Sequence, residues 1–156
     1  MIRRSLIMSA PLVPWIVAGC ASPPPPPPPP RKVPLEIIAT PDINPDIRER
    51  ASPLTVRVFA LKTPANFGTA DFFSLYEKEA ATLGADVVLR EEMVLRPGES
   101  RNLTWTVSPD FKFVGVLAAF RDLERAQWRD VQPLTAAPGL RVLLSGRRAF
   151  LQAVGG

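Results

Sequence analysis

Apolar and polar residues alternate along much of the chain after residue 33. The clearest case is the segment 54–61, whose even-numbered residues are all apolar while Thr55 and Arg57 point the other way. This period of two predicts a strand with one buried face. Further strands are expected at 35–39, 86–95, 100–107, 111–120, 128–134, 140–145 and 148–152.

Turn residues between these segments suggest how the strands connect. Pro97-Gly98 between 86–95 and 100–107 predicts a hairpin, and Gly146-Arg147 predicts another that closes the domain. In the second arm of the first hairpin, Trp105 is expected to point inward with its neighbours two residues away on either side. The segment 111–120 is apolar on both faces, so we expect a central strand that is covered on both sides.

One segment has helical spacing instead. Between Asp71 and Gly84, an apolar stripe recurs every three or four residues, with Asp71 or Thr69 placed to cap the start and Gly84 to end the helix. The stripe consists of Phe72, Tyr76, Ala80 and Leu83, with Phe73 beside it. Together the segments predict a mainly β protein, a two-sheet β-sandwich with one inserted helix, over residues 33–156.

The residues before this domain have a different character. Arg3 and Arg4 precede a short apolar stretch that ends at Val17-Ala18-Gly19-Cys20, as in a secretory leader. The ending is similar to the lipobox of bacterial lipoproteins, which implies a signal peptide over residues 1–19 and a lipidated Cys20. The alternatives are a leader with an incidental cysteine and an uncleaved anchor, but the apolar run is shorter than the roughly 20 residues that a spanning helix needs.

Cys20 is the only cysteine, so it cannot form a disulfide within the chain. Residues 20–32 then form a linker dominated by the proline run Pro23–Pro30. Such a run is either a stiff spacer or a ligand for an aromatic groove, and its place directly after the anchor favours the spacer. By analogy with lipoprotein sorting in enteric bacteria, Ala21 after the cysteine directs the protein to the outer membrane, facing the periplasm.

Charge and composition remove several classes of function. Of the 19 basic residues, Arg3 and Arg4 would leave with the leader, so 17 remain against 15 acidic residues, a net charge of +2. These charges are scattered, and we expect no nucleic-acid binding. The chain has no histidine, so His-based catalysis and metal sites are excluded. Carboxylate pairs at Glu77/Glu79 and Glu91/Glu92 remain, but we expect no enzyme activity, no metal and no cofactor.

Several short segments, in this order and spacing behind a lipobox, resemble the type VI secretion lipoprotein family (TssJ/SciN). The resembling segments are 44–46, 52–62, 70–76, 83–86, 96–99, 115–123 and 126–129. Two features depart from the family pattern: the eight prolines, and Glu49-Arg50 where a glycine-containing turn is expected.

The resemblance implies a transthyretin-like sandwich and a role without catalysis. It implies an outer-membrane lipoprotein that binds the periplasmic domain of the inner-membrane protein TssM and, through TssM, joins TssL in a trans-envelope complex. No small-molecule substrate is expected. A generic lipoprotein carrier or binding module is the alternative, and it would need an unfilled interior.

In that family the loop between the first two strands contributes to the TssM contact, which here maps to residues 40–51. The candidate contact residues are Asp42, Ile43, Asn44, Asp46, Ile47, Arg48 and Arg50. Their pattern is an apolar centre within a charged rim, which suits an interface. The alternative is a solvated loop whose Asx residues only make turns, with Ile43 or Ile47 tucked inward. Arg121-Asp122 and Trp128-Arg129 are further candidates, with Trp128 expected in the core first.

Overall fold

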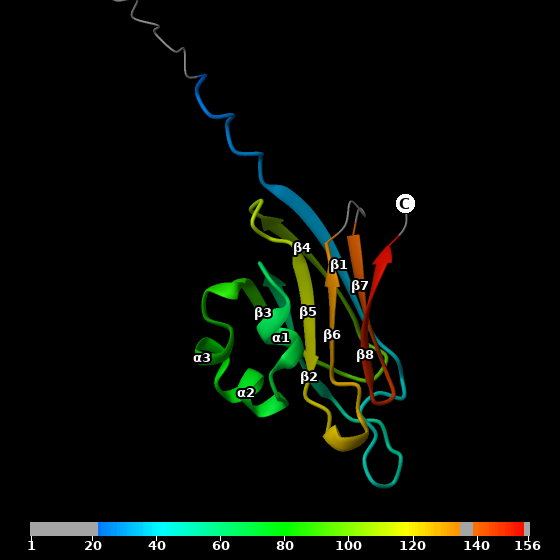
Figure 1. The fold of residues 1–156 in the computed structure, drawn as a ribbon. Helices are drawn as coiled ribbons and strands as arrows, with labels where there is room; N and C mark the ends of the chain where they lie inside the picture. Colours follow the sequence, from blue (N-terminus) through cyan, green and yellow to red (C-terminus); the bar gives the residue numbers. More distant parts are fainter. Residues whose placement is uncertain (1–21, 135–138, 155–156) are drawn as a thin grey trace, which may run out of the picture.

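The computed structural model describes residues 22–134 and 139–154. Eight strands form two four-stranded sheets, in the orders β4-β1-β7-β8 and β3-β2-β5-β6 (Figure 1). The strands of the first sheet are β1 (Arg31–Ala39), β4 (Ser100–Val107), β7 (Gly139–Ser145) and β8 (Arg148–Val154). Those of the second are β2 (Leu54–Leu61), β3 (Val87–Leu95), β5 (Phe113–Ala118) and β6 (Arg129–Pro133).

The inner faces of the two sheets share one core. Alternate residues of β1 and β2 supply much of it, from Val33 to Ala39 and from Leu54 to Ala60, each at most 2% exposed. The mainly β, two-sheet sandwich expected from the alternation is therefore confirmed, and among the described residues this core runs from Val33 to Leu151.

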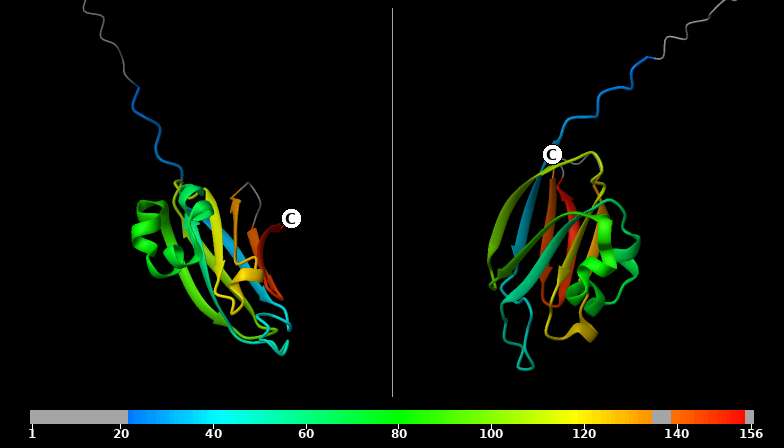
Figure 2. Two further views of the ribbon diagram at one scale, coloured as in Figure 1. Left: turned by 60° about the horizontal axis from the view of Figure 1, so that its bottom comes forward. Right: turned by 90° about the vertical axis from the view of Figure 1, so that its left-hand side faces the viewer.

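The outer face of the β3-β2-β5-β6 sheet is covered by the inserted helices (Figure 2). There Phe59 of β2 and Leu117 of β5 pack with Phe67 of the insertion, all fully buried. A Cβ at Gly115 of β5 would lie 2.9 Å from the Phe67 ring, so glycine is what lets the ring approach the strand. The predicted central strand covered on both sides is confirmed.

The insertion itself differs from the single helix expected over 71–84. It consists of α1 (Ala65–Thr69), α2 (Phe72–Glu77) and α3 (Glu79–Leu83), with the break at Lys78. Asp71 caps α2 by accepting a hydrogen bond from the Ser74 amide, as predicted, at 3.0 Å. Because of the break, the buried residues are Leu75 and Leu83, whereas Ala80 of the predicted stripe is exposed.

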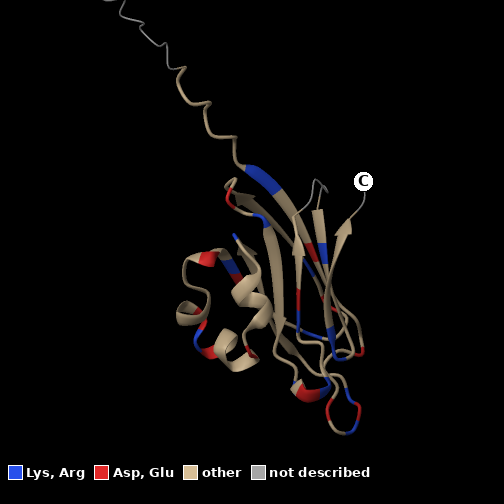
Figure 3. Ribbon diagram, viewed as in Figure 1, with Lys and Arg blue, Asp and Glu red and all other residues tan. Residues whose placement is uncertain are grey.

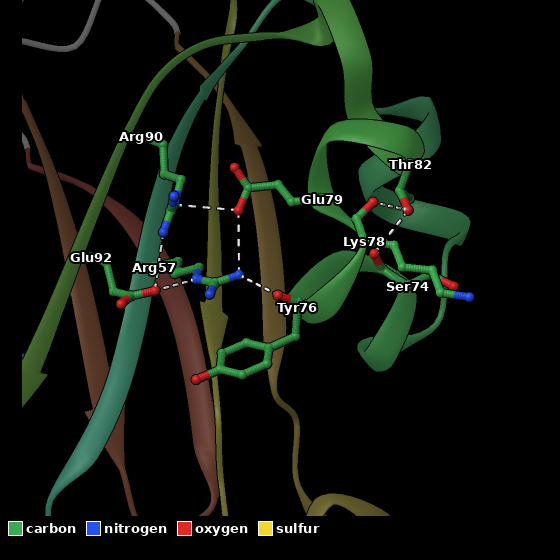
Figure 4. Close-up of polar contacts among 8 residues, drawn as sticks. All are labelled: Arg57, Ser74, Tyr76, Lys78, Glu79, Thr82, Arg90 and Glu92. Carbon is green, nitrogen blue, oxygen red and sulfur yellow. Dashed lines mark hydrogen bonds and ion pairs between the residues drawn. The ribbon is translucent and has the colours of Figure 1, made fainter.

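Polar contacts fasten this insertion to the edge of the sheet (Figure 4). Arg57 of β2 donates to the Tyr76 carbonyl at 2.7 Å and to Glu92 of β3, and its guanidinium lies over the Tyr76 ring. Glu79 forms ion pairs with Arg57 and with Arg90, both at 3.3 Å. The hydrogen bond that Arg57 donates holds the pKa of Glu92 below its usual range, because it favours the charged carboxylate.

The predicted hairpin between 86–95 and 100–107 is wrong. β3 pairs with β2, whereas β4 pairs with β1 in the other sheet. The Pro97-Gly98 turn therefore crosses from one sheet to the other. The closing hairpin is confirmed, since β7 and β8 pair from Ser145↔Arg148 to Gly139↔Val154.

Within the described ranges, no helix is long and apolar enough to cross a membrane. The expected signal peptide and Cys20 lie outside the described residues.

Trp105 tests the core directly. It is 3% exposed and meets Phe111 edge-on, with ring centroids 6.1 Å apart. We expect Trp105→Ala to lower the free energy of unfolding by ~3–5 kcal/mol through the cavity it leaves. The control is Phe73→Ala, because Phe73 is 58% exposed and should cost far less. Denaturant unfolding of both variants measures this, and equal stabilities would contradict the assignment.

Candidate interaction surface

Three connections meet at the end of the sandwich opposite the start of β1 (Figures 1 and 2). They are the β1–β2 loop (residues 40–53), the β5–β6 connection with its short 3-10 helix η2 (Leu123–Arg125), and the β7–β8 turn at Gly146-Arg147. An open groove of about 980 Å³ lies among them. Its lining residues are Pro45, Asp46, Ile47, Glu49, Arg121, Asp122, Glu124, Arg125 and Arg147. We call this end of the molecule the loop surface.

Asn44 holds the three connections together. Its amide group donates to the Pro53 carbonyl at 2.8 Å, and its side-chain oxygen accepts from the Arg121 backbone N–H at 2.9 Å. Its own backbone N–H donates to the Gly146 carbonyl at 2.8 Å. Asn44 has a φ of 49° and is 3% exposed, so a left-handed backbone and three bonds fix the base of the loop. Asn44 therefore has a structural role in this loop, as in the alternative in which Asx residues make the turns, and a direct contact of its side chain with a partner stays a prediction.

Ile43, the neighbour of Asn44, is the isoleucine that is tucked inward, one of the two possibilities that the sequence left open. Its side chain is fully buried in the main core, and its carbonyl accepts from the Ser52 amide at 3.0 Å. Ile47, in contrast, is 99% exposed at the tip of the loop. The two isoleucines have opposite roles: Ile43 anchors the loop to the core, and Ile47 is presented to solvent.

Asp46 organises the tip that carries Ile47. Its carboxylate accepts the backbone N–H groups of Arg48 at 2.8 Å and Arg50 at 3.0 Å, and it pairs with the Arg50 guanidinium at 2.8 Å. The bond from the Arg50 amide is the main reason that the pKa of Asp46 lies below its usual range. Glu49 has a φ of 59°, which is the conformation that the expected glycine would adopt.

The remaining rim residues of the predicted loop divide into paired and free charges. The hydroxyl of Thr40 donates to Asp42, and this bond is the main cause of the lowered pKa of that carboxyl. Arg50 is occupied by Asp46, as described above. No ion pair is found for Arg48 among the described residues, and its side chain is exposed, so its positive charge is not neutralised by a neighbour in the loop.

Sequence reasoning did not identify the role of Arg147, which bridges two of the connections. It pairs with Glu49 at 3.1 Å, and its Nε lies 3.3 Å from Asp122, close enough for an ion pair but not aligned for a hydrogen bond. The hydrogen bond that Arg147 donates to the Glu49 carboxylate is the main reason that the pKa of Arg147 is raised. Figure 3 shows that acidic and basic residues alternate around this end. The only advance signal was the charged run 121–125 and the turn at Gly146.

The other candidates lie elsewhere. Trp128 is half-buried and meets Phe72 edge-on, with centroids 5.3 Å apart, while Arg129 donates to the carbonyls of Phe67 and Ala70. Both residues thus contact the helical insertion, and neither lines the groove. Of the carboxylate pairs, Glu79 and Glu92 are engaged by Arg57 and Arg90. The described residues contain no group of three or more His, Cys, Asp or Glu placed to hold a metal ion.

Comparison with known proteins gives a consistent result. Residues 31–148 match the model of the T6SS-SciN family, described as "Type VI secretion lipoprotein, VasD, EvfM, TssJ, VC_A0113". The T6SS lipoprotein TssJ1 from Pseudomonas aeruginosa is 35% identical, with a TM-score of 0.77 over 82% of this chain and 99% of that one. No curated protein sequence matches this chain closely enough to serve as a relative.

Two further solved structures share the fold. Serratia marcescens Lip, a membrane bound component of the Type VI Secretion System, is 24% identical, with a TM-score of 0.71 over 81% of this chain and 98% of that one. The structure described as "T6SS protein TssM C-terminal domain (869-1107) from EAEC" holds a chain that is 26% identical, with a TM-score of 0.65. That match covers 79% of this chain and 98% of that one.

The Asp46 carboxylate gives a prediction about the loop tip. Asp46→Ala removes the acceptor of two backbone N–H groups, so we expect faster hydrogen exchange at Arg48 and Arg50 while the thermal midpoint hardly changes. Asp46→Asn, which keeps an acceptor oxygen, is the matched control and should lie between. Because the folded pKa is lowered, the carboxylate stabilises the tip above the ordinary carboxyl pKa, and the effect is lost as pH falls through the lower folded value. Exchange rates equal to wild type in Asp46→Ala would contradict this.

Proposed function

Since this chain belongs to the type VI secretion lipoprotein family, we propose that it anchors the trans-envelope complex of a type VI secretion system at the outer membrane by binding the periplasmic domain of TssM, and through it TssL. The observation that carries the proposal is the loop surface, where a clamped loop presents the fully exposed Ile47 beside a charged groove. An isolated apolar side chain on a preorganised tip suits protein recognition, because little flexibility is lost on binding.

The charges of the loop surface support a protein partner as well. Asp46, Glu49 and Asp122 are already paired within the chain, through Arg50 and Arg147. When a partner covers these residues, each buried charge keeps its counter-ion. Covering the same number of unpaired charges would cost more free energy. We propose that Ile47 inserts into an apolar pocket of TssM, with Arg48 and the groove residues as the polar rim.

The anchor completes the proposal. Cys20, after a signal peptide over residues 1–19, would carry the lipid, and two or more acyl chains hold a protein stably at a membrane. Residues 20–32 would link that lipid to the sandwich of residues 33–156. The proposed role is structural and needs no catalysis, and membership of a secretion lipoprotein family supports it.

Binding to TssM can be tested by titrating soluble Arg31–Gly156 with the TssM periplasmic fragment. We expect Ile47→Asp to weaken binding by ~2 kcal/mol, about 30-fold in Kd, with an unchanged melting temperature. The matched control is Val94→Asp, which places the same charge on an exposed valine of β3. Equal affinity of Ile47→Asp and wild type would move the interface elsewhere.

The same titration can test the loop as a whole. Ile43 is part of the core, and Asn44 bonds the loop to the neighbouring connections. Therefore only Pro45–Glu49 should be replaced by a short Gly-Ser turn. Shortening an exposed loop costs little stability, so binding should fall while the fold persists. Arg48→Glu should mainly change the association rate and its salt dependence, as rim charges do.

The lipid anchor is tested separately with Cys20→Ser in cells. We expect the variant to lose palmitate labelling and membrane retention, because the thiol that would carry the lipid is gone. The sandwich should remain folded, since its core begins at Val33. Soluble domain from the variant should still bind the TssM fragment. Membrane fractionation with labelled palmitate decides this, and label or retention equal to wild type would refute the lipoprotein assignment.

A further inference from the structure

The proline run extends away from the domain instead of folding onto it. In Figure 1 the chain before Arg31 leaves the sandwich roughly in the direction of β1, and the right-hand view of Figure 2 shows that it leans to one side of that direction. Residues 22–30 are all exposed and have no regular hydrogen-bonded structure. The loop surface lies at the other end of the same strand, because the β1–β2 loop starts at Thr40, directly after β1.

This segment contains no residue that can act as a hinge. Every residue from Ser22 to Pro29 precedes a proline, which confines it to extended or polyproline II backbone. The prolines themselves have a fixed φ. The next residue, Arg31, is already a strand residue aligned with Val107 of β4. The stiff segment therefore passes into the sheet without a flexible joint of glycine or serine residues.

β1 is also held from both sides. Its register with β4 runs from Arg31↔Val107 to Ile38↔Ser100, and its register with β7 from Leu35↔Leu140 to Ala39↔Leu144. At its end, the Thr40 amide donates to the Leu144 carbonyl at 2.9 Å. A force applied to the proline run therefore acts on β1, which is held by hydrogen bonds to two neighbouring strands. The same strand connects the proline run to the loop surface.

We propose that residues 22–39 form one rigid strut of fixed length, which sets the distance between the lipid-bearing end of the chain and the loop surface. This inference rests on the proposed function, because it assumes a lipid at one end and a partner at the other. Nine residues of polyproline II span about 28 Å and nine strand residues about 30 Å, so the strut measures nearly 60 Å. A flexible linker in place of residues 22–30 would average only about 15–18 Å.

The stiffness can be measured directly. In a Cys20→Ser background, spin labels at Ser22→Cys and Thr106→Cys report the distance between the start of the run and the β4 residue that faces Lys32. We expect one narrow distribution near 30 Å, as polyproline II of this length requires. The control replaces Pro23–Pro30 with eight Gly-Ser residues, which should give a broad and shorter distribution. A wild-type distribution as broad as that of the control would overturn the strut.

The role of the length is tested with the full lipidated chain in cells. One variant keeps only four prolines, which shortens the strut by about 12 Å, and the other carries the Gly-Ser replacement. Both variants should bind the TssM fragment like wild type in solution. In cells, several-fold less TssM should be recovered with the outer membrane, because the effective concentration of the loop surface at TssM falls when the linker no longer matches the distance it has to span.

The other outcomes each contradict the inference. If both variants recover TssM like wild type, the length is irrelevant. If four prolines suffice and only Gly-Ser fails, the prolines matter but their number does not, as for a ligand of an aromatic groove, and the strut of fixed length is overturned. A failure of the proposed function is recognised separately, since wild-type soluble domain would then not bind the TssM fragment at all.

Discussion

The pairing of β1 on both sides is the constraint on which the rest of this structure depends. β1 lies between β4 and β7, and its inward residues from Val33 to Ala39 are buried against the opposite sheet. One end of the strand receives the proline run and the other end becomes the β1–β2 loop. Because the strand is fixed along its whole length, the position of the loop surface follows from the position of the chain that enters the domain.

The sequence allowed the strands and the class of fold to be predicted, since alternation of period two directly reflects burial on one face. It did not allow the partner of each strand to be predicted. Pro97-Gly98 is compatible with a turn within a sheet and with a crossing between sheets, and only packing decides that β3 joins β2 and β4 joins β1. Similarly, the helical spacing over 71–84 gave no sign of the break at Lys78, whose backbone leaves the helical region.

The site was harder to predict than the fold, because a loop has no period from which burial can be read. Ile43 and Ile47 look alike in the sequence, yet one is fully buried and the other is 99% exposed. What separates them is Asn44, whose positive φ turns the chain and whose side-chain and backbone bonds reach the two other connections, at Arg121 and Gly146. Such bonds join residues that are far apart in the sequence and that only the fold brings together. The ion pairs of Arg147 with Glu49 and with Asp122 are further examples.

The same bonds explain how a surface rich in charge can still serve as a rigid contact. The Asp46 carboxylate accepts hydrogen bonds from the loop's own backbone, and the Arg147 guanidinium forms ion pairs with the two neighbouring connections. These charges therefore stabilise the shape of the tip rather than attract a partner. Arg48 and Ile47 are the tip side chains that these bonds leave open to solvent: no ion pair among the described residues engages Arg48, and Ile47 is 99% exposed. Because other side chains make the internal bonds, the tip can keep one conformation while these two stay exposed.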